Sequence, residues 1–264
     1  MPEPQGGETV TRQRIDINCD MGESFGAWEK GDDAAMLKIV SSANIACGFH
    51  AGDPDIMART FALARERNVA VGAHPGFPDL MGFGRRQIPY SVGEIERLVA
   101  YQIGAAQAVS QYVGHPITHV KPHGALGNLA QHDEAVARAI CNAIKAVDSS
   151  LICLAIALGQ QHRIAEEMGL TVVSEIFADR AYTDEGILVP RGMKGAVIRD
   201  PDAAAWRVVE MVSEGAIVTV SGKRLETPMG SICVHGDAPE ALAIAQAVRS
   251  GLEKQGFAIA NFIH

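Results

Sequence analysis

The chain has 264 residues, of which 47% are hydrophobic and 20% charged, and its formal net charge is −8. This composition is ordinary for a soluble protein with a large core, and the acidic balance argues against nucleic acid or an anionic membrane as partner. No apolar run approaches the roughly 20 residues that span a bilayer.

Apolar runs typical of strands alternate with helical patterns from residue 15 to about residue 256. Strands are predicted at 15–20, 44–50, 69–74, 118–121, 151–157, 172–175 and 231–234. Helices are predicted at 33–39, 53–68, 91–113, 133–147 and 200–215. Two more are predicted, one that ends near residue 169 and one that starts within 237–239 and runs to 255. A hairpin is predicted over 217–226. Asp53 followed by Pro54, and Ser91 with Glu94, are typical helix starts.

These elements predict a distorted seven-stranded (β/α) barrel that forms a single catalytic domain over residues 15–264. The chain lacks the glycine-rich dinucleotide fingerprint expected of a doubly wound sheet, and it has no GxxxxGK[ST] phosphate loop. Residues 1–14 are polar, without the apolar core of a signal peptide, and are predicted to be a disordered tail. Five cysteines without CxxC spacing favour a reducing compartment, so we expect a cytoplasmic protein.

Six of the predicted strands end in polar residues suited to catalysis, and the carboxyl ends of parallel strands converge on one site. Asp20 and Glu23 follow the first strand, with Asn18 on the same face as Asp20. A carboxylate there can act as a general base or bind a divalent cation. The alternative is that Glu23 only caps or pairs within a loop.

His50 and His74 end the second and third predicted strands. With Asp20 they would make a plausible triad for zinc, nickel or manganese, but the HxxxH or HExxH spacing of a strong metal motif is absent. Proton transfer or hydrogen bonding to substrate is the favoured role. The structural alternative is a pair of buried histidines bonded to the backbone.

Lys121 and His123 flank Pro122 after the fourth strand. A lysine at such a place can bind an anion or stabilise an oxyanion, and Schiff-base chemistry is open. The structural alternative is an ion pair between Lys121 and Glu175. We predict Asp20, Glu23, His50, His74, Lys121 and His123 as catalytic residues. Those predicted to bind substrate are Asn18, Asn44, Glu175, Asp179, Arg180 and His235.

Other polar residues have simpler interpretations. Arg85 and Arg86 are candidates for binding carboxylate or phosphate, although Arg86 is better interpreted as a solvated loop residue. Asp53, Asp200 and Asp237 are expected to cap helices, with Asp237 also close to His235 at a strand end. The histidines away from strand ends are set aside: His115, His132, His162 and His264.

Six motifs together resemble the LamB/YcsF family, in order and over residues 16–247. They are DINCDMGESFG (16–26), SANIACGFHAGDP (42–54), GAHPGFPD (72–79), VKPHGAL (120–126), EIFADRAY (175–182) and CVHGD (233–237). The resemblance implies a barrel similar to that of polysaccharide deacetylases. It also implies a subunit of an ATP-dependent 5-oxoprolinase, which opens 5-oxo-L-proline to L-glutamate with ATP, and partner subunits B and C.

The resemblance makes ATP the expected cofactor, with Mg²⁺ accompanying the nucleotide, and a homo-oligomer is open. Two other functions remain as alternatives. One is a metal-dependent amidase or deacetylase acting on a small polar amide. The other is a non-catalytic subunit that binds a lactam or a sugar. The number of titratable groups at strand ends argues against a pure binding role.

Overall fold

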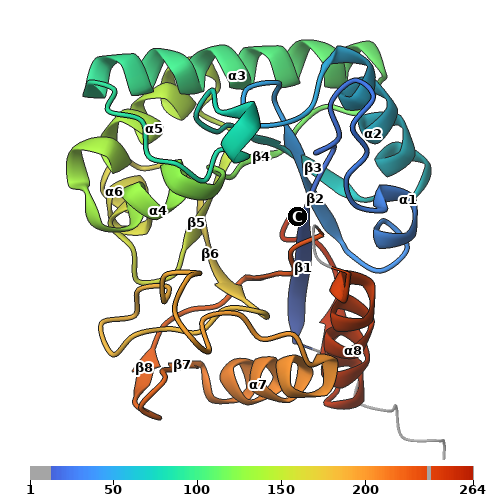
Figure 1. The fold of residues 1–264 in the computed structure, drawn as a ribbon, viewed down its shortest axis with the longest axis vertical. Helices are drawn as coiled ribbons and strands as arrows, with labels where there is room; N and C mark the ends of the chain where they lie inside the picture. Colours follow the sequence, from blue (N-terminus) through green and yellow to red (C-terminus); the bar gives the residue numbers. More distant parts are fainter. Residues whose placement is uncertain (1–12, 237–238, 264) are drawn as a thin grey trace, which may run out of the picture.

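Seven parallel strands close into a barrel in the computed structural model, which describes residues 13–236 and 239–263. They are β1 (Arg14–Met21), β2 (Ser42–Ala46), β3 (Ala70–His74), β4 (His119–Val120), β5 (Ile152–Ile156), β6 (Val172–Phe177) and β9 (Ser231–Cys233). Each pairs with the next, and β9 pairs with both β6 and β1. Figure 1 shows the helices on the outside of this ring. The predicted seven-stranded (β/α) barrel is confirmed.

The helices follow the predicted order. They are α1 (Asp33–Met36), α2 (Pro54–Glu66), α3 (Val92–Tyr112), α4 (Gly124–His132), α5 (Glu134–Val147), α6 (Gln160–Glu167), α7 (Pro201–Glu214) and α8 (Ala241–Lys254), with a short 3₁₀ turn η1 (Leu80–Gly82). Asp53 accepts hydrogen bonds from the first turn of α2, and Ser91 with Glu94 forms the expected capping box of α3. The hairpin of β7 (Ala216–Val218) and β8 (Arg224–Glu226) is also confirmed.

Three local predictions were wrong or incomplete. The second strand ends at Ala46 rather than His50, because the chain turns at Gly48, whose φ of 90° favours glycine. Helix α4 was not predicted. Neither was β10 (Ala258–Ile259), which pairs with β1 at Arg14 and Ile15.

Parts of some predictions lie outside the described residues. Of the predicted tail, residues 1–12 are not described, whereas Arg14 already belongs to β1. Asp237 and His264 are also outside the described part of the chain. None of the described helices is both long and apolar enough to cross a membrane.

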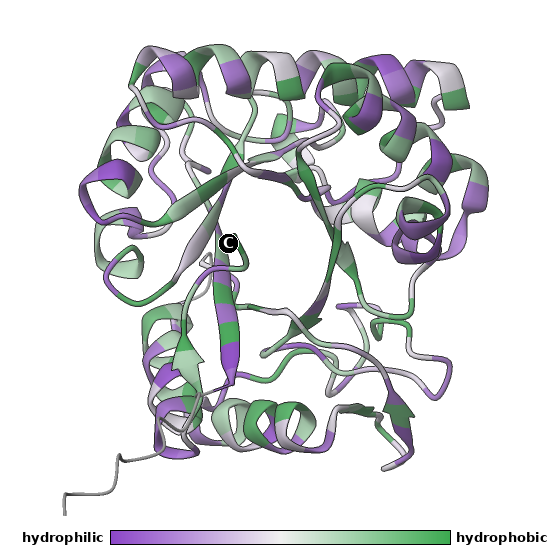
Figure 2. Ribbon diagram, turned by 180° about the vertical axis from the view of Figure 1, so that it is seen from behind, coloured by the Kyte–Doolittle hydropathy of each residue, from purple (hydrophilic) through white to green (hydrophobic). Residues whose placement is uncertain are grey.

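The barrel interior is polar, unlike the layers of branched apolar side chains usual in such barrels. Figure 2 shows β1 banded in hydrophilic and hydrophobic residues. The alternation follows from the two-residue period of a strand. Asn18 of β1 contacts Glu175 of β6, and Asn44 of β2 contacts His119 of β4. Because β1 and β6, like β2 and β4, are not neighbours in the ring, these contacts cross the barrel interior.

The outer faces of the strands and the inner faces of the helices form one continuous apolar core. Ile17 of β1, Ile45 of β2 and Val71 of β3 are fully buried there. Burying this surface is the main stabilising term for the barrel. It also holds the carboxyl ends of the strands around one opening of the barrel, which we call the mouth. The polar residues lie there.

Candidate active site

A network of amide and carboxylate side chains fills the barrel beneath the mouth. The side-chain amide of Asn18 donates to Glu175 Oε1 and Ser231 Oγ, both at 2.8 Å. The amide of Asn44 donates to Asn18 Oδ1 at 2.8 Å and Asp20 Oδ1 at 2.9 Å, and His119 Nε2 lies 2.9 Å from Asn44 Oδ1. Each group therefore holds the next in place. A Cβ at residue 72 would come within 2.3 Å of the His119 ring, so Gly72 makes room for that ring.

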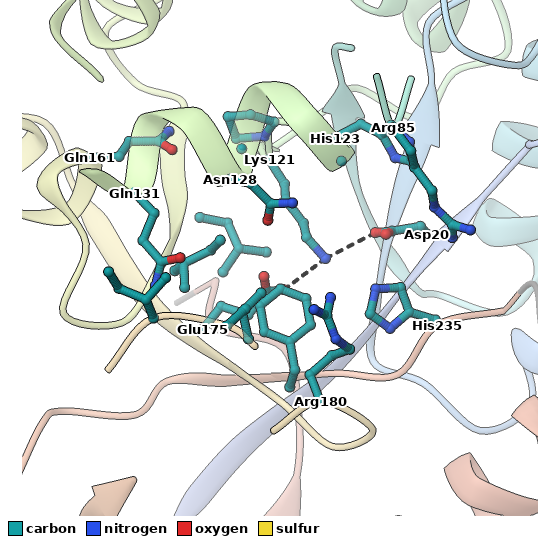
Figure 3. Close-up of a pocket in the computed structure, with 18 of the residues that line it drawn as sticks. Asp20, Arg85, Lys121, His123, Asn128, Gln131, Gln161, Glu175, Arg180 and His235 are labelled. Carbon is teal, nitrogen blue, oxygen red and sulfur yellow. Dashed lines mark hydrogen bonds and ion pairs between the residues drawn. The ribbon is translucent and has the colours of Figure 1, made fainter. Parts of the chain in front are cut away.

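Lys121 stands above this network between two carboxylates (Figure 3). Its Nζ lies 3.0 Å from Asp20 Oδ1 and 2.8 Å from Glu175 Oε1, and also 3.0 Å from Cys233 Sγ. All three ionisable residues are nine-tenths buried or more. We call Asp20, Lys121 and Glu175 the lysine cluster. The ion pair of Lys121 with Glu175 that the structural alternative required is present, and Asp20 adds a second.

The charges of the lysine cluster follow from this geometry. Burial alone would lower the pKa of Lys121, but Asp20, Cys233 and Glu175 outweigh it and raise that pKa well above its usual value. Burial alone would raise the pKa of Asp20, but His74 and Lys121 hold it well below its usual value. Lys121 is therefore an ammonium ion beside an ionised Asp20, which suits oxyanion stabilisation and disfavours a Schiff base.

Three histidines and a carboxylate form a second cluster beside the first. His123 Nδ1 lies 3.0 Å from His74 Nε2, and the His50 and His123 rings stack with centroids 3.7 Å apart. Glu23 Oε1 lies 3.4 Å from His50 Nε2 and 3.6 Å from His123 Nδ1. We call these four residues the histidine cluster. It meets the lysine cluster where His74 Nε2 lies 3.3 Å from Asp20 Oδ2.

Burial lowers the pKa of both His50 and His123 well below the usual value, so both rings are neutral. One ligand atom from each of Glu23, His50, His74 and His123 lies within 4.8 Å of the others. Imidazoles and a carboxylate at this spacing can accept a proton or bind a metal ion.

A cavity of about 510 Å³ opens onto both clusters. Asp20, Lys121 and Glu175 line it from the lysine cluster, and His74 and His123 from the histidine cluster. Arg85, Arg180 and Arg191 bring positive charge to its walls. Its size is within the range of small-molecule sites, about 300–1,000 Å³.

Two further side chains shape one wall of the cavity. His235 Nδ1 lies 2.8 Å from the Asp179 carboxylate, and Arg191 donates to His235 Nε2 at 2.9 Å. Burial favours the neutral acid, but His235 and Arg191 outweigh it and lower the pKa of Asp179. Arg180 donates to the carbonyl oxygens of Val189 and Ala196, which fixes it against the loop that follows β6.

The structure brings the predicted site residues together, but not all of them reach the cavity. Those that line it are Asp20, His74, Lys121, His123, Glu175, Arg180 and His235. Asn18 and Asn44 lie beneath and hold the lysine cluster, while Glu23 and His50 lie behind the histidine pair. Asp179 reaches the cavity through His235. Arg86 pairs with Asp79 in a loop, whereas Arg85 lines the cavity.

Several cavity residues were missed by the sequence analysis. Asn128, Gln131 and His132 belong to α4, which was not predicted, and His132 had been set aside. Gln161 lies in the first turn of α6. Arg191 lies in the glycine-rich loop 181–197, whose length and charge were the available signal.

The whole described barrel matches a known family. Residues 15–264 match the model described as the LamB/YcsF family. The chain belongs to this family. It is 59% identical to a protein named as the A subunit of 5-oxoprolinase from Gluconobacter oxydans (strain 621H), over 95% of this chain and 98% of that protein.

Solved structures agree with the fold. A lactam utilization protein from Thermus thermophilus is 44% identical, with a TM-score of 0.89 over 95% of this chain and all of that chain (100%). The catalytic domain of a peptidoglycan N-acetylglucosamine deacetylase from Eubacterium rectale has a TM-score of 0.51 at 9% identity, covering 96% of this chain and 90% of that one. This second likeness concerns the fold alone and confirms the predicted similarity to the deacetylase barrel.

Proposed function

We propose that this chain is the lactam-opening subunit of an ATP-dependent 5-oxoprolinase, which converts 5-oxo-L-proline to L-glutamate in the cytoplasm together with subunits B and C. The substrate is suggested by the 59% identical relative that bears the 5-oxoprolinase name. The observation that carries the chemistry is the buried Lys121 ammonium, fixed between Asp20 and Glu175 at the wall of the cavity. Five free, buried cysteines agree with a reducing compartment.

The cavity offers what a lactam needs in order to open. A lactam is a stabilised amide, so its carbonyl oxygen must gain negative charge or a phosphoryl group before water can add to its carbon. Lys121 provides a fixed positive charge for that oxygen. The arginines on the walls, Arg180 and Arg191, suit the substrate carboxylate.

The positive charges on the cavity walls support the proposed use of ATP. Arg85, Arg180, Arg191 and Lys121 line one cavity, which suits a phosphoryl group beside a small lactam. When bound, ATP supplies the phosphoryl group that activates the lactam oxygen. Because the sequence has no phosphate-binding loop, subunits B and C share the binding of the nucleotide in this proposal, and Mg²⁺ would accompany it.

The histidine pair supplies the proton acceptor. His74 and His123 reach the cavity wall beside Asp20, and the neutral ring of His123 carries a nitrogen lone pair. A proton taken from water there makes the nucleophile that adds to the activated carbon. The ring C–N bond would then break, with the ring nitrogen taking up the proton removed from water and leaving as the amino group. The acyl phosphate that remains would be hydrolysed by a second water to phosphate and the side-chain carboxylate of glutamate.

The test is glutamate release from 5-oxoproline by this chain with purified subunits B and C. We expect release only when all three subunits and ATP are present. Asp20→Asn removes the charge that orients Lys121, so kcat should fall by about 10²-fold. Glu210→Gln makes the same chemical change on the outer helix α7 and should leave kcat unchanged. Full-rate turnover by the isolated chain with ATP would contradict the shared role of B and C.

A second candidate function is metal-dependent hydrolysis of a small amide, which the histidine cluster favours. Turnover by this chain alone, without ATP and abolished by a chelator, would support it against the first proposal. A third outcome, ligand binding that survives Asp20→Asn with no turnover in any mixture, would instead support a binding subunit.

A further inference from the structure

Histidines on the cavity wall differ in the kind of partner that holds them. His74 Nδ1 lies 2.6 Å from the carbonyl oxygen of Lys121, and His123 Nε2 lies 2.8 Å from that of Phe83. A carbonyl oxygen only accepts, so both of these nitrogens donate. These partners are neutral backbone groups. His235, in contrast, is held between two charged side chains.

The two partners of His235 define which of its ring nitrogens carries the proton. Arg191 Nη2 lies 2.9 Å from His235 Nε2, and a guanidinium has donors only, so Nε2 must accept. The proton of the ring is therefore on Nδ1, which lies 2.8 Å from both oxygens of Asp179 and donates to that carboxylate. The ring also stacks on Phe177, with centroids 5.5 Å apart. The lone pair of Nε2 thus has a fixed direction.

A carboxylate and an imidazole arranged in this way can act together as a base. A buried carboxylate that accepts from Nδ1 holds the ring in one tautomer and stabilises the imidazolium that forms when Nε2 takes a proton. Asp179 is almost fully buried, whereas 12% of the His235 side chain is exposed at the cavity wall. Water can therefore reach the ring, but the guanidinium of Arg191 occupies the lone pair of Nε2.

Arg191 is placed to leave that lone pair when an anion binds. Arg180, which also lines the cavity, is buried and fixed by the carbonyl oxygens of Val189 and Ala196. Arg191 is only half-buried, and it precedes Gly192, where an added Cβ would meet nothing within 4 Å. A carboxylate or phosphate accepts a stronger hydrogen bond from a guanidinium than a neutral ring nitrogen does, because both partners are then charged.

We propose that His235 is a second proton acceptor of the site, and that an anionic substrate releases it by drawing Arg191 away from Nε2. This role rests on the proposed lactam opening, in which the substrate carboxylate binds at Arg180 and Arg191. His235 is then a catalytic residue, because it takes a proton from a reacting water. Asp179 is a positioning residue, which acts through the ring of His235.

The proposed reaction has two waters to activate, and the site has acceptors on two sides of Asp20. Figure 3 shows Asp20 between His123 and His235. One ring nitrogen of His235 lies within 4.8 Å of an Asp20 carboxylate oxygen, so the ring borders the lysine cluster. His123 serves the water that adds to the activated lactam. We therefore assign to His235 the second water, which hydrolyses the acyl phosphate.

Protons and bonds balance in this second step. His235 Nε2 takes a proton from the water as the water oxygen bonds to the acyl carbon. The bond between that carbon and the phosphate oxygen breaks, and the imidazolium returns the proton to the departing phosphate. The carboxylic acid that remains loses its own proton to solvent, so the products are glutamate and phosphate.

The first experiment follows the His235 ring of the full chain by ¹⁵N nuclear magnetic resonance, with labelled histidine and with His235→Asn to assign the signal. At about pH 8, above the usual histidine pKa of about 6.5, we expect the proton on Nδ1. Adding 5-oxoproline or inorganic phosphate should shift the Nε2 resonance downfield, because the bond from Arg191 is lost. Arg191→Met should show the downfield position without an anion. Lys194→Met removes an exposed charge from the same loop and should match wild type.

Three results of this experiment would overturn the proposal. They are a proton on Nε2 in the wild type, an Arg191→Met resonance at the wild-type position, and failure of both anions to bind or to move the resonance. If only inorganic phosphate binds and moves it, the release of His235 stands and 5-oxoproline is the wrong substrate.

The second experiment measures turnover with subunits B and C, ATP and hydroxylamine, which converts an acyl phosphate to a stable hydroxamate. His235→Asn should lower kcat for glutamate release by about 10²–10⁴-fold with little change in KM, and should increase the yield of hydroxamate. Asp179→Asn should act in the same direction, whereas Arg191→Met should raise KM by about tenfold. Lys194→Met should leave kcat and KM unchanged. Glutamate release at the wild-type rate by His235→Asn would overturn the proposal.

Discussion

Two buried clusters lie side by side at the barrel mouth, and they differ in how their charges are balanced. In the lysine cluster, one ammonium lies within 3.0 Å of two carboxylates, and amides of the barrel interior hold the carboxylates in place. In the histidine cluster, His123 Nδ1 and His74 Nε2 lie 3.0 Å apart, and the His50 ring has no hydrogen bond. The first cluster contains its own lysine cation, whereas the second consists of three imidazoles and one carboxylate.

This difference indicates how the two clusters divide the chemistry. A lysine fixed by two carboxylates keeps its charge and position, as a group that stabilises charge must. A set of imidazoles can exchange protons, as a group that activates water must. The proposed lactam opening needs both types, and the shared edge between Asp20 and His74 joins them.

The largest expected effect comes from removing the cation of the lysine cluster. Lys121→Met leaves Asp20 and Glu175 buried without the ammonium that pairs with both, so the free energy of unfolding should fall by about 3–5 kcal/mol. Urea denaturation followed by circular dichroism measures this loss. The double variant Lys121→Met, Glu175→Gln removes one of the stranded charges and should recover part of the stability. Equal destabilisation of the single and double variants would show that lost packing, rather than charge, is the cause.

Asp16 sharpens the comparison, because it is a buried carboxyl whose described side-chain partners are serines rather than a lysine. It accepts hydrogen bonds from Ser41, Ser42 and Ser231 in the barrel interior. Burial, partly offset by these serines, raises the pKa of Asp16 to about 6 from 3.8. Asp20, with Lys121 and His74 nearby, shifts in the opposite direction.

A raised carboxyl pKa makes the folded protein less stable as pH rises. Between about pH 4 and pH 6 the unfolded chain loses this proton while the folded chain keeps it, so Asp16 withdraws about 3 kcal/mol over that window. Asp16→Asn has no proton to lose. The stability of Asp16→Asn relative to wild type should therefore increase by that amount from about pH 4 to about pH 6.5 in urea titrations. A constant difference would mean that Asp16 has an ordinary pKa in the barrel.

The barrel could be predicted from the sequence because each strand is a short apolar run followed by a helical pattern. Helix α4 was missed because Gly124, Gly127 and Asn128 have low intrinsic helix propensity, and its contacts with the barrel outweigh that preference. The end of β2 was misplaced because the apolar residues of 47–50 continue the strand pattern, whereas Gly48 ends the strand through its left-handed φ.

The position of the candidate site at the strand ends could be predicted, but the separate roles of its two clusters could not. Parallel strands bring Asp20, His74, Lys121 and Glu175 to one mouth whatever their contacts. Asn18 and Asn44 hold other side chains inside the barrel because β9 pairs with β1 and closes the ring. No local sequence pattern encodes this closure. The donor nitrogens of His74 and His123 depend on the carbonyl groups of Lys121 and Phe83, which only the folded chain brings near.

The smallest expected effect compares two glycine positions, one beside the His119 ring and one beside the His50 ring. A Cβ at residue 72 would lie 2.3 Å from the His119 ring, and a Cβ at residue 76 would lie 2.6 Å from His50 Nδ1. Gly72→Ala and Gly76→Ala should each destabilise by about 1–3 kcal/mol through overpacking. The His119 ring has hydrogen bonds to lose, with Asn44 and Thr118, whereas the His50 ring has none. Gly72→Ala should therefore be worse by about 1 kcal/mol.

Gly104→Ala provides the matched control, because a Cβ there meets nothing within 4 Å and the residue lies inside α3. That variant should be more stable than wild type by about 1 kcal/mol, as expected for alanine in place of glycine in a helix. Thermal or urea unfolding of the three variants measures the order. If Gly76→Ala were the most damaging, the His50 ring would be held in place by contacts of its own. The contrast between a lysine cluster whose charges are paired and a histidine cluster with a ring that has no hydrogen bond would then fail.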